Sequence, residues 1–409
     1  MASSAAPEPT AHPDTPRATA PQGSRAQANA QPGIIRVGVI GGGQLARMMV
    51  PPAIHLGLRI SVLAEGEGMS AARAADAVGD YRDPETVFAF ADTVDVVTFD
   101  HEHVPGEILH ELERRGKAVH PRPDALQFAQ DKILMREKLT ELGVPVPDWA
   151  AVENEQELQQ FIDEHGGRAV VKTARGGYDG KGVRVVSRAD EARDWFTALA
   201  EDGRGGRLLV EQLVDFVREL SQLVARRPSG EVAAWPVVET VQRDGVCAEV
   251  IAPAPVQHAS TLDEAARIGH AIAEGIGVTG VLAVEMFETT DGRVLVNELA
   301  MRPHNSGHFS IEGSVTSQFE QHLRAVTDLP LGDTSMTAPV AVMINVLGGP
   351  AEGPMPVRYA EVLAAHPRAK VHSYDKTPRP GRKVGHVTVT GEDLDTVLAE
   401  ARAAAHAFD

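Results

Sequence analysis

Two glutamates have the type and spacing that could bind a divalent cation. Runs of β-branched residues flank Asp291-Gly292, and Asp-Gly between two such runs is a strong signal for a hairpin with a two-residue loop. That loop places Glu285 directly opposite Glu298, with Cβ atoms about 4.5–5.5 Å apart. Two facing carboxylates destabilise a sheet unless a cation lies between them or one is protonated. With Asn297 beside them they predict a Mg²⁺ site, and two solvated glutamates on an open face are the alternative.

A glycine-rich loop between two short β-type runs could hold phosphate groups. The runs cover Ala169 to Thr173, with Lys172 near the end, and Val183 to Val186. The loop between them contains Gly176, Gly177, Tyr178, Asp179, Gly180, Lys181 and Gly182. Glycine lets backbone N–H groups approach a ligand and point at it together, which suits phosphate oxygens. The alternative is a surface hairpin whose glycines serve only the turn.

Two later segments are rich in polar and basic residues. The run MRPHNSGHFS directly follows the glutamate hairpin and suggests a substrate wall that includes Asn305 and His308. Lys376, Arg379, Arg382 and Lys383 then fall within eight residues of an otherwise acidic protein. A basic loop of this kind favours binding of a phosphomonoester, and a solvated basic turn is the alternative.

A glycine motif follows the first apolar strand, which covers residues 34–40. Gly41 to Ala46 match G-x-G-x-x-A ahead of a helix-like run, and Glu65 follows a second strand. This is a dinucleotide-binding fingerprint. Alternatively, the glycines only allow a tight βα turn in a doubly wound domain that holds no dinucleotide. Asp100 to His103 lack the spacing of a zinc site, so they predict a polar loop at the ligand-binding edge of the sheet.

Composition sets limits on the class of protein. The formal charge of −18 argues against nucleic acid or an anionic membrane as partners. No apolar run approaches the ~18 residues that span a bilayer. The single Cys247 fits a reducing cytoplasm. Residues 1–33, with nine Ala and six Pro, are expected to form a disordered tail.

The order of β runs and helical patterns predicts an α/β chain in three parts. Residues 34–130 are expected to form a Rossmann-like domain, 131–215 a small α+β lid, and 216–409 an α+β domain that carries the metal and substrate sites. Between the first two parts, one helix is predicted from Asp124 to Leu142.

Assembled in this order, the parts resemble the ATP-grasp superfamily and, within it, the family of ATP-dependent N5-carboxyaminoimidazole ribonucleotide synthases. The resemblance runs from about residue 34 to the end. It rests on GGGQLARM, VVKTARGGYDGKG, VEQLVDFVREL, NELAMRPHNSGH, FE-HLRAVTDLPLG and YDK-x-x-RPGRKVGH. It implies ATP and Mg²⁺ as cofactors, 5-aminoimidazole ribonucleotide and bicarbonate as substrates, and a cytoplasmic homodimer.

The resemblance also implies a role for individual residues. Nucleotide contacts are expected from Lys132, Lys172, Gly177, Tyr178, Asp179, Gly180, Lys181, Gly182, Glu211, Gln212, Leu213, Val214, Glu219, Gln242, Asn297 and Glu298. The implied metal ligands are Glu285 and Glu298. The implied catalytic residues, bordering the ribonucleotide, are Tyr178, Asp179, Lys181, Asn305 and His308. Lys376, Arg382 and Lys383 would hold its 5′-phosphate.

The reaction implied by the resemblance has two steps. Bicarbonate attacks the γ-phosphate of ATP to give carboxyphosphate and ADP, and the two lysines together with Mg²⁺ neutralise the transferring group. The 5-amino group of the ribonucleotide then captures carboxyphosphate, or the CO₂ released from it, under a lid that excludes water.

Three departures from the family pattern bear on affinity rather than on the reaction. Lys181 stands where many members have Arg, Gln242 where His is frequent, and Met301 where Pro is frequent. Two other functions remain open at this point. One is another ATP-grasp activity such as formate-dependent phosphoribosylglycinamide formyltransferase, and the other is an NAD-dependent oxidoreductase resting on the glycine motif and Glu65.

Overall fold

The structure is a computed structural model that describes residues 33–176, 182–202 and 206–409, with the side chains of Asp202 and Ala259 left out. The sequence predictions for the tail at 1–32 fall outside the described residues. The same holds for Gly177, Tyr178, Asp179, Gly180 and Lys181. Residues 34–409 form one unit by their internal contacts.

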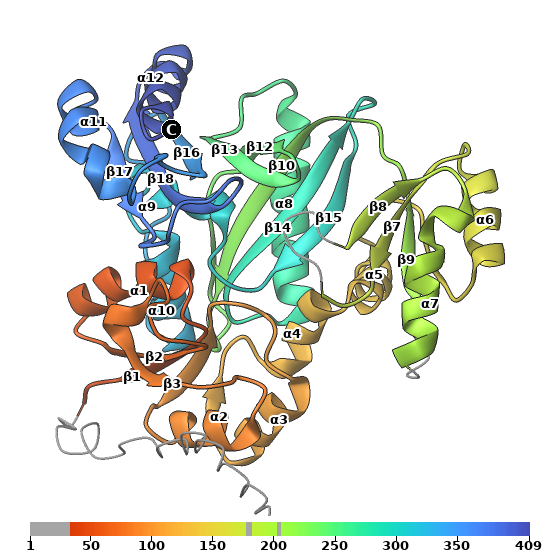
Figure 1. Cartoon of the computed structure of the whole chain (residues 1–409), viewed down its shortest axis with the longest axis horizontal. Helices are drawn as coiled ribbons and strands as arrows, with labels where there is room; N and C mark the ends of the chain where they lie inside the picture. The colour runs from red at the N-terminus through yellow and green to blue at the C-terminus, as the bar shows by residue number, and fades with distance from the viewer. Residues whose placement is uncertain (1–32, 177–181, 203–205) are drawn as a thin grey trace, which may run out of the picture. The chain divides into compact units, whose positions relative to one another are not determined.

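The chain begins with a parallel five-stranded sheet in the order β3-β2-β1-β4-β5 (Figure 1). Its strands are β1 (Arg36–Ile40), β2 (Arg59–Ala64), β3 (Ala75–Val78), β4 (Val96–Phe99) and β5 (Ala118–Val119). The helices of this region are α1 (Gln44–His55), η2 (Ala72–Ala74), α2 (Pro84–Ala91) and α3 (Gly106–Arg114). The central strands β1 and β4 are almost entirely buried, as expected of parallel strands covered on both faces. This arrangement is the predicted Rossmann-like sheet.

The helix predicted from Asp124 to Leu142 is in fact two helices, α4 (Pro123–Gln130) and α5 (Lys132–Glu141). Asp131 is extended between them, with φ −132° and ψ 112°, and its carboxylate accepts from the N–H groups of Ile133 and Leu134. An aspartate in this position caps a new helix rather than continuing the old one. The single-helix prediction was wrong because its apolar periodicity continues through the cap.

A four-stranded antiparallel sheet follows in the order β6-β9-β7-β8. Its elements are β6 (Trp149–Val152), α6 (Glu155–Glu164), β7 (Ala169–Thr173), β8 (Val183–Val186), η3 (Ala189–Ala192), α7 (Arg193–Asp202) and β9 (Leu208–Gln212). The predicted strands on either side of the glycine loop are confirmed, with Lys172 paired to Val183. Figure 1 shows α6 and α7 beside this sheet.

The rest of the chain is organised by a nine-stranded sheet in the order β15-β14-β10-β12-β13-β16-β18-β17, with β11 beside β10. Its strands are β10 (Phe216–Arg226), β11 (Val232–Ala234), β12 (Val238–Arg243), β13 (Val246–Ala252), β14 (Gly280–Thr289), β15 (Val294–Ala300), β16 (Val340–Leu347), β17 (Lys370–Ser373) and β18 (Lys383–Gly391). Its helices are α8 (Ala259–Ile276), η4 (Asn305–Gly307), α9 (Ser310–Gly313), α10 (Gln318–Val326), η5 (Met355–Arg358), α11 (Tyr359–Ala365) and α12 (Leu394–His406).

The β14–β15 hairpin has a different turn from the predicted one but the predicted glutamate pairing. The Thr289 N–H donates to the backbone oxygen of Arg293, so the loop has three residues, 290–292. Gly292 in this loop adopts φ +79°. That loop shifts the register by one residue near the turn. A bulge at Asn297 then restores it, so Glu285 stands opposite Glu298. The pairing prediction is therefore confirmed, although its assumed two-residue loop was wrong.

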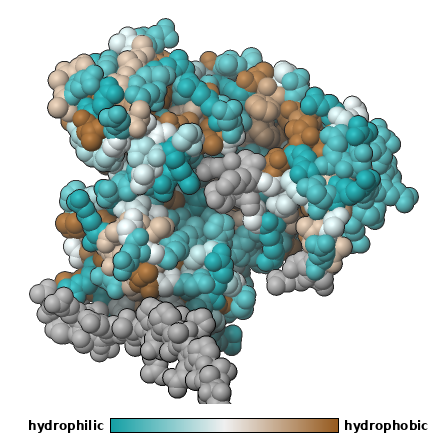
Figure 2. All heavy atoms as spheres, viewed as in Figure 1, coloured by the Kyte–Doolittle hydropathy of each residue, from teal (hydrophilic) through white to brown (hydrophobic). Residues whose placement is uncertain are grey.

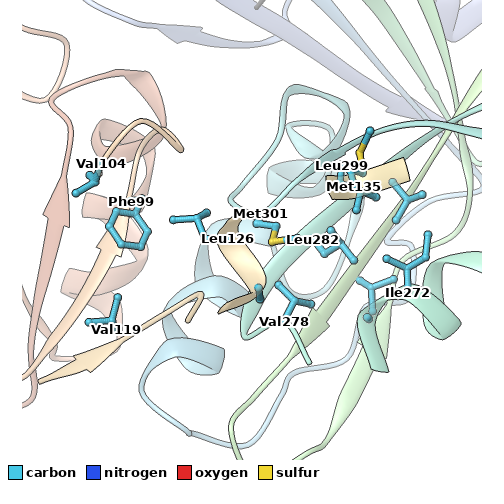
Figure 3. Packing of buried hydrophobic residues seen from close by; sticks show 14 of the residues in the cluster. Phe99, Val104, Val119, Leu126, Met135, Ile272, Val278, Leu282, Leu299 and Met301 are labelled. Carbon is cyan, nitrogen blue, oxygen red and sulfur yellow. The ribbon is translucent and has the colours of Figure 1, made fainter. Parts of the chain in front are cut away.

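One hydrophobic cluster joins the first sheet to the large sheet. Phe99 of β4, Leu126 of α4, Met135 of α5 and Leu282 of β14 all belong to it (Figure 3). Because α4 and α5 contribute to this cluster, the backbone at Lys132, the first residue of α5, is held in place. Hydrophilic residues cover most of the visible face of the described chain (Figure 2). Among the described residues, no helix is both long and apolar enough to cross a membrane.

Candidate active site

A cleft of about 2020 Å³ brings together residues of the four-stranded and nine-stranded sheets and of the segments that follow β1 and β4 of the first sheet. The predicted site residues that line it are Lys132, Lys172, Glu211, Gln212, Leu213, Val214, Glu219, Gln242, Glu285, Asn297, Glu298, Asn305, Lys376, Arg382 and Lys383. Asp100 to His103 line it as well, in agreement with a polar loop at the ligand-binding edge of the first sheet. Positions from residue 100 to residue 383 thus face one space.

The surroundings of the two facing glutamates favour the binding of a cation. Burial, and then the charge of Glu298, raise the pKa of Glu285 to about 8. His304, whose pKa burial holds well below the ordinary value, lies 3.2 Å from Glu285 through Nε2. A neutral imidazole does not compensate a carboxylate charge, and Lys383 and Arg302 offset only part of the effect of burial, so a bound cation would favour the ionised form of Glu285.

The bulge at Asn297 shapes the same place, because it leaves both Asn297 and Glu298 lining the cleft. Lys132 at the start of α5 donates to Glu298 Oε1 at 2.9 Å. Burial opposes ionisation of Glu298, but Lys132 holds its pKa below the ordinary value. Two carboxylates and an amide oxygen are a donor set that fits Mg²⁺.

Lys172 is held by two neighbours in the cleft. Its Nζ lies 2.6 Å from Glu211 Oε2 and donates to Asn297 Oδ1 at 3.0 Å. Lys132 therefore contacts one of the paired glutamates, and Lys172 contacts Asn297, the residue before Glu298. The third N–H of an ammonium group remains to be directed at a ligand.

Glu219 and Gln242 form a second polar pair in the cleft. Glu219 lies on β10 and Gln242 on the adjacent strand β12, and their side chains are hydrogen-bonded. Burial raises the pKa of Glu219. Leu213, Val214 and Phe216 line the cleft nearby in sequence and supply apolar surface. Two hydrogen-bonding side chains beside apolar surface suit a ribose and a base.

The basic loop reaches the cleft from the C-terminal part of the chain. Lys376 donates to Gln44 Oε1 at 2.7 Å, and Arg47 pairs with Asp375 at 3.3 Å. Both partners lie on α1, so the first part of the chain braces this loop. The loop's basic side chains can hold an anion in the cleft, because Arg382 and Lys383 also line it.

The two candidate catalytic residues that follow the hairpin have different surroundings. Asn305 lines the cleft, is 7 % exposed, and its amide pairs with no nitrogen or oxygen atom of the described residues. His308 is fully buried, receives a hydrogen bond to Nδ1 from Gln318, and does not line the cleft. The placement of His308 does not fit the expected contact with substrate. Gly182 likewise does not line the cleft.

Family models match three successive segments of the chain. A ribonucleotide synthetase preATP-grasp domain matches residues 34–130, and an ATP-grasp domain matches residues 137–319. A phosphoribosylaminoimidazole carboxylase C-terminal domain matches residues 341–400.

Curated relatives that match most of this chain are named for the same activity. The N5-carboxyaminoimidazole ribonucleotide synthase of Corynebacterium ammoniagenes is 50% identical over 385 residues, which are 91% of this chain and 92% of that protein. The enzyme of the same name from Mycobacterium bovis is 50% identical over 374 residues, 90% and 87% of the two chains. The chain belongs to the N5-carboxyaminoimidazole ribonucleotide synthase family. The predicted family and the prediction of an ATP-dependent carbon–nitrogen ligase are both confirmed.

Solved structures of the N5-carboxyaminoimidazole ribonucleotide synthase family share the fold. An Aspergillus clavatus N5-carboxyaminoimidazole synthase was determined in complex with ADP and 5-aminoimidazole ribonucleotide. It superposes with a TM-score of 0.81 at 31% identity, over 91% of this chain and 98% of that one. The predicted ATP-grasp architecture is thereby confirmed.

Membership of this family decides against both alternative functions, and the glycine motif shows why NAD is a poor fit. The Gly42 N–H donates to Glu65, and the Ala46 N–H donates to Asp100 at 2.7 Å. A Cβ at Gly43 would lie only 2.0 Å from Asp100 Oδ2. The chain's own carboxylates thus occupy the helix start at which a dinucleotide phosphate binds in other proteins.

Three contacts that support the cleft were not predicted from the sequence. Gln44 contacts Lys376 across 332 positions, and no spacing rule connects them. Glu102 binds Arg302 at 2.7 Å. Arg136 stands four residues after Lys132, so helical periodicity could have placed it on the same face, but its apolar neighbours favour an exposed position for it.

Proposed function

We propose that this chain carboxylates 5-aminoimidazole ribonucleotide to N5-carboxyaminoimidazole ribonucleotide with ATP and bicarbonate, in purine biosynthesis. One observation carries the proposal. The same cleft contains two places for anions, one at Lys132 and Lys172 beside the paired glutamates and one at the basic loop. A ligase that joins a phosphate donor to a phosphorylated acceptor needs both.

The nucleotide is assigned to the first place. Lys132 and Lys172 bind its phosphates, Glu211 to Val214 and the Glu219–Gln242 pair hold the base and ribose, and Glu285 and Glu298 hold Mg²⁺. When bound, Mg²⁺ supplies charge neutralisation on the transferring phosphoryl group. The raised pKa of Glu285 supports this assignment, because such a carboxylate binds a cation in place of a proton.

The acceptor is assigned to the second place. Lys376, Arg382 and Lys383 hold its 5′-phosphate, and Asn305, whose amide pairs with no nitrogen or oxygen atom of the described residues, is available to orient a substrate. Tyr178, Asp179 and Lys181, which belong to the glycine-rich loop, remain predicted contacts of the acceptor. Since His308 is buried behind the cleft, it positions the wall rather than touching substrate.

The proposed chemistry has two steps. A bicarbonate oxygen bonds to the γ-phosphorus while the bond to the bridging oxygen of ADP breaks, which gives carboxyphosphate. The 5-amino nitrogen then bonds to the carboxyl carbon as phosphate leaves, and the amine gives up one proton. The lysines lower the barrier of the first step by neutralising charge, and exclusion of water protects the carboxyphosphate.

A coupled assay tests this proposal. Purified protein with Mg-ATP is given bicarbonate and 5-aminoimidazole ribonucleotide, and ADP release is followed. Release is expected only with both substrates. Release with formate and glycinamide ribonucleotide instead would replace the proposal by a formyltransferase, and no ribonucleotide-dependent release would overturn it.

We further propose a cytoplasmic homodimer. Ile54 and Val78, 68% and 54% exposed in the first part of the chain, supply apolar surface for an interface. Light scattering during size exclusion tests the dimer: a mass near twice the 43.6 kDa of the chain is expected, and a mass near 43.6 kDa at micromolar concentration contradicts it.

A further inference from the structure

Arg136 is a fully buried arginine that does not line the cleft and has no role so far. It lies on α5, one turn after Lys132. Its Nε binds Glu211 Oε1 at 2.5 Å, and its Nη2 donates to the backbone oxygen of Asn297 at 2.7 Å. One guanidinium therefore connects α5 to β9 of the four-stranded sheet and to β15 of the nine-stranded sheet.

The two partners of Arg136 are also the two partners of Lys172. Lys172 Nζ contacts the second oxygen of Glu211 and the side-chain oxygen of Asn297. Arg136 thus contacts the other oxygen of the Glu211 carboxylate and the backbone of Asn297, the two residues that hold the Lys172 ammonium. A guanidinium is rigid and planar, so it sets the orientation of a carboxylate more tightly than a lysine does.

The charges explain why two cations are needed. Burial alone would raise the pKa of Glu211, which is 3 % exposed, but Arg136 and then Lys172 keep it below the ordinary value. Lys172 has to turn toward phosphate when a nucleotide binds. If Lys172 were the sole partner of Glu211, that motion would leave a buried carboxylate uncompensated, which is strongly unfavourable.

We propose that Arg136 is a positioning residue for nucleotide binding. It keeps Glu211 and Asn297 in place, so Lys172 can pass from Glu211 to a nucleotide phosphate without leaving a buried charge unpaired. The inference rests on the proposed contact of Lys172 with the nucleotide. Because Arg136 acts through Glu211, it also fixes the start of the segment 211–214 assigned to adenine. It does not act on the acceptor, whose proposed ligands lie on other elements.

The test compares R136M with R136K and a matched control. Calorimetry gives the Kd for ADP without turnover, and steady-state kinetics give separate KM values for ATP and for the ribonucleotide. R136M is expected to weaken ADP binding and raise the KM for ATP by about tenfold or more, with the ribonucleotide KM nearly unchanged. R136K is expected to recover part of the loss, because a lysine keeps the charge but not both contacts.

The matched control is R402M. Glu249 is fully buried and, like Glu211, has two cationic partners, Arg243 and Arg402. Neither Arg402 nor Glu249 lines the cleft, so R402M removes one of two partners of a buried carboxylate away from the nucleotide. It is expected to leave the ADP Kd unchanged. An equal loss in R402M would show that R136M acts by general destabilisation and would overturn the proposal.

K172M separates failure of this inference from failure of the proposed site. Normal ADP binding by K172M would remove the nucleotide role of Lys172 and the inference with it. Weak binding by K172M but normal binding by R136M would overturn the inference alone. If R136M does not fold, R136K carries the test: an ADP Kd and an ATP KM equal to those of the wild type would contradict the need for two contacts.

Discussion

Glu285 on β14 stands directly opposite Glu298 on β15, one strand apart on the wall of the cleft. Burial, and to a smaller extent repulsion between the two carboxylates, raises the pKa of Glu285 to about 8. Lys132 compensates Glu298, whereas the contact of Glu285 with His304 supplies no charge. The pair therefore favours a cation near Glu285.

Glu298→Gln tests this pair. Turnover is expected to fall by at least about 100-fold, because the variant loses one of two charged ligands for the metal. Binding of Mn²⁺ as a paramagnetic substitute, followed by its resonance signal with ADP present, is expected to weaken, and the circular dichroism spectrum to stay the same. E274Q, at an exposed position on α8, serves as the control. A fully active E298Q would remove the metal assignment.

The sequence predicted the glutamate pairing correctly, although the prediction missed both the third loop residue and the bulge, whose effects on the register cancel. A three-residue loop moves the register by one position, and the bulge at Asn297 moves it back. The alternation of residues in a strand does not reveal a bulge, since a bulge depends on the partner strand. The pairing was correct, whereas the reason that Asn297 and Glu298 line the cleft together appeared only in the structure.

Contacts between elements far apart in the chain could not be predicted from the sequence, because local patterns do not show which elements pack together. Local pattern places Lys132 at a helix and Lys172 on a strand, but it does not show that Glu211 binds Lys172 and Arg136 at once. The split between α4 and α5 was missed because Asp131 caps within a continuous apolar pattern. The family resemblance predicted which residues contact the nucleotide, and the structure shows which groups hold Lys132 and Lys172.

Arg382→Met tests the place assigned to the acceptor phosphate. The KM for the ribonucleotide is expected to rise by about tenfold, since a charge-assisted contact to phosphate is lost. The KM for ATP should change little, because the nucleotide is assigned to the other place in the cleft. Lys370, exposed on β17, gives the control K370M. Equal increases in both KM values would show that the two anion places are not separate.

The buried His322 predicts a pH dependence of stability. Its Nδ1 accepts from the Val281 N–H and its Nε2 bonds to Thr98, so the ring is neutral. Burial, with a smaller effect of His120, lowers its pKa from 6.5 to about 3. Below pH 6.5 the unfolded chain therefore binds a proton that the folded chain rejects. The free energy of unfolding should fall by about 1.4 kcal/mol per pH unit from this group between pH 6.5 and 3.

Urea unfolding between pH 8 and pH 5 measures that slope. H322Q can keep both hydrogen bonds without titrating, so the contribution of His322 should be absent from its slope, and its free energy of unfolding should fall less steeply below pH 6.5 than that of the wild type. Other titrating groups, including His120 with a pKa lowered to about 4 by burial, contribute equally to both proteins. Identical slopes in the two proteins would contradict the prediction.

The transfer of atoms from bicarbonate tests the central claim most directly. Protein, Mg-ATP and 5-aminoimidazole ribonucleotide are incubated with bicarbonate labelled with ¹³C and ¹⁸O, and the products are read by nuclear magnetic resonance. The proposed reaction places ¹³C on the 5-amino nitrogen of the ribonucleotide and one ¹⁸O in the released phosphate, because carboxyphosphate bridges the two steps. Ribonucleotide-dependent ADP formation with unlabelled phosphate, or with no ¹³C on the ribonucleotide, would contradict it.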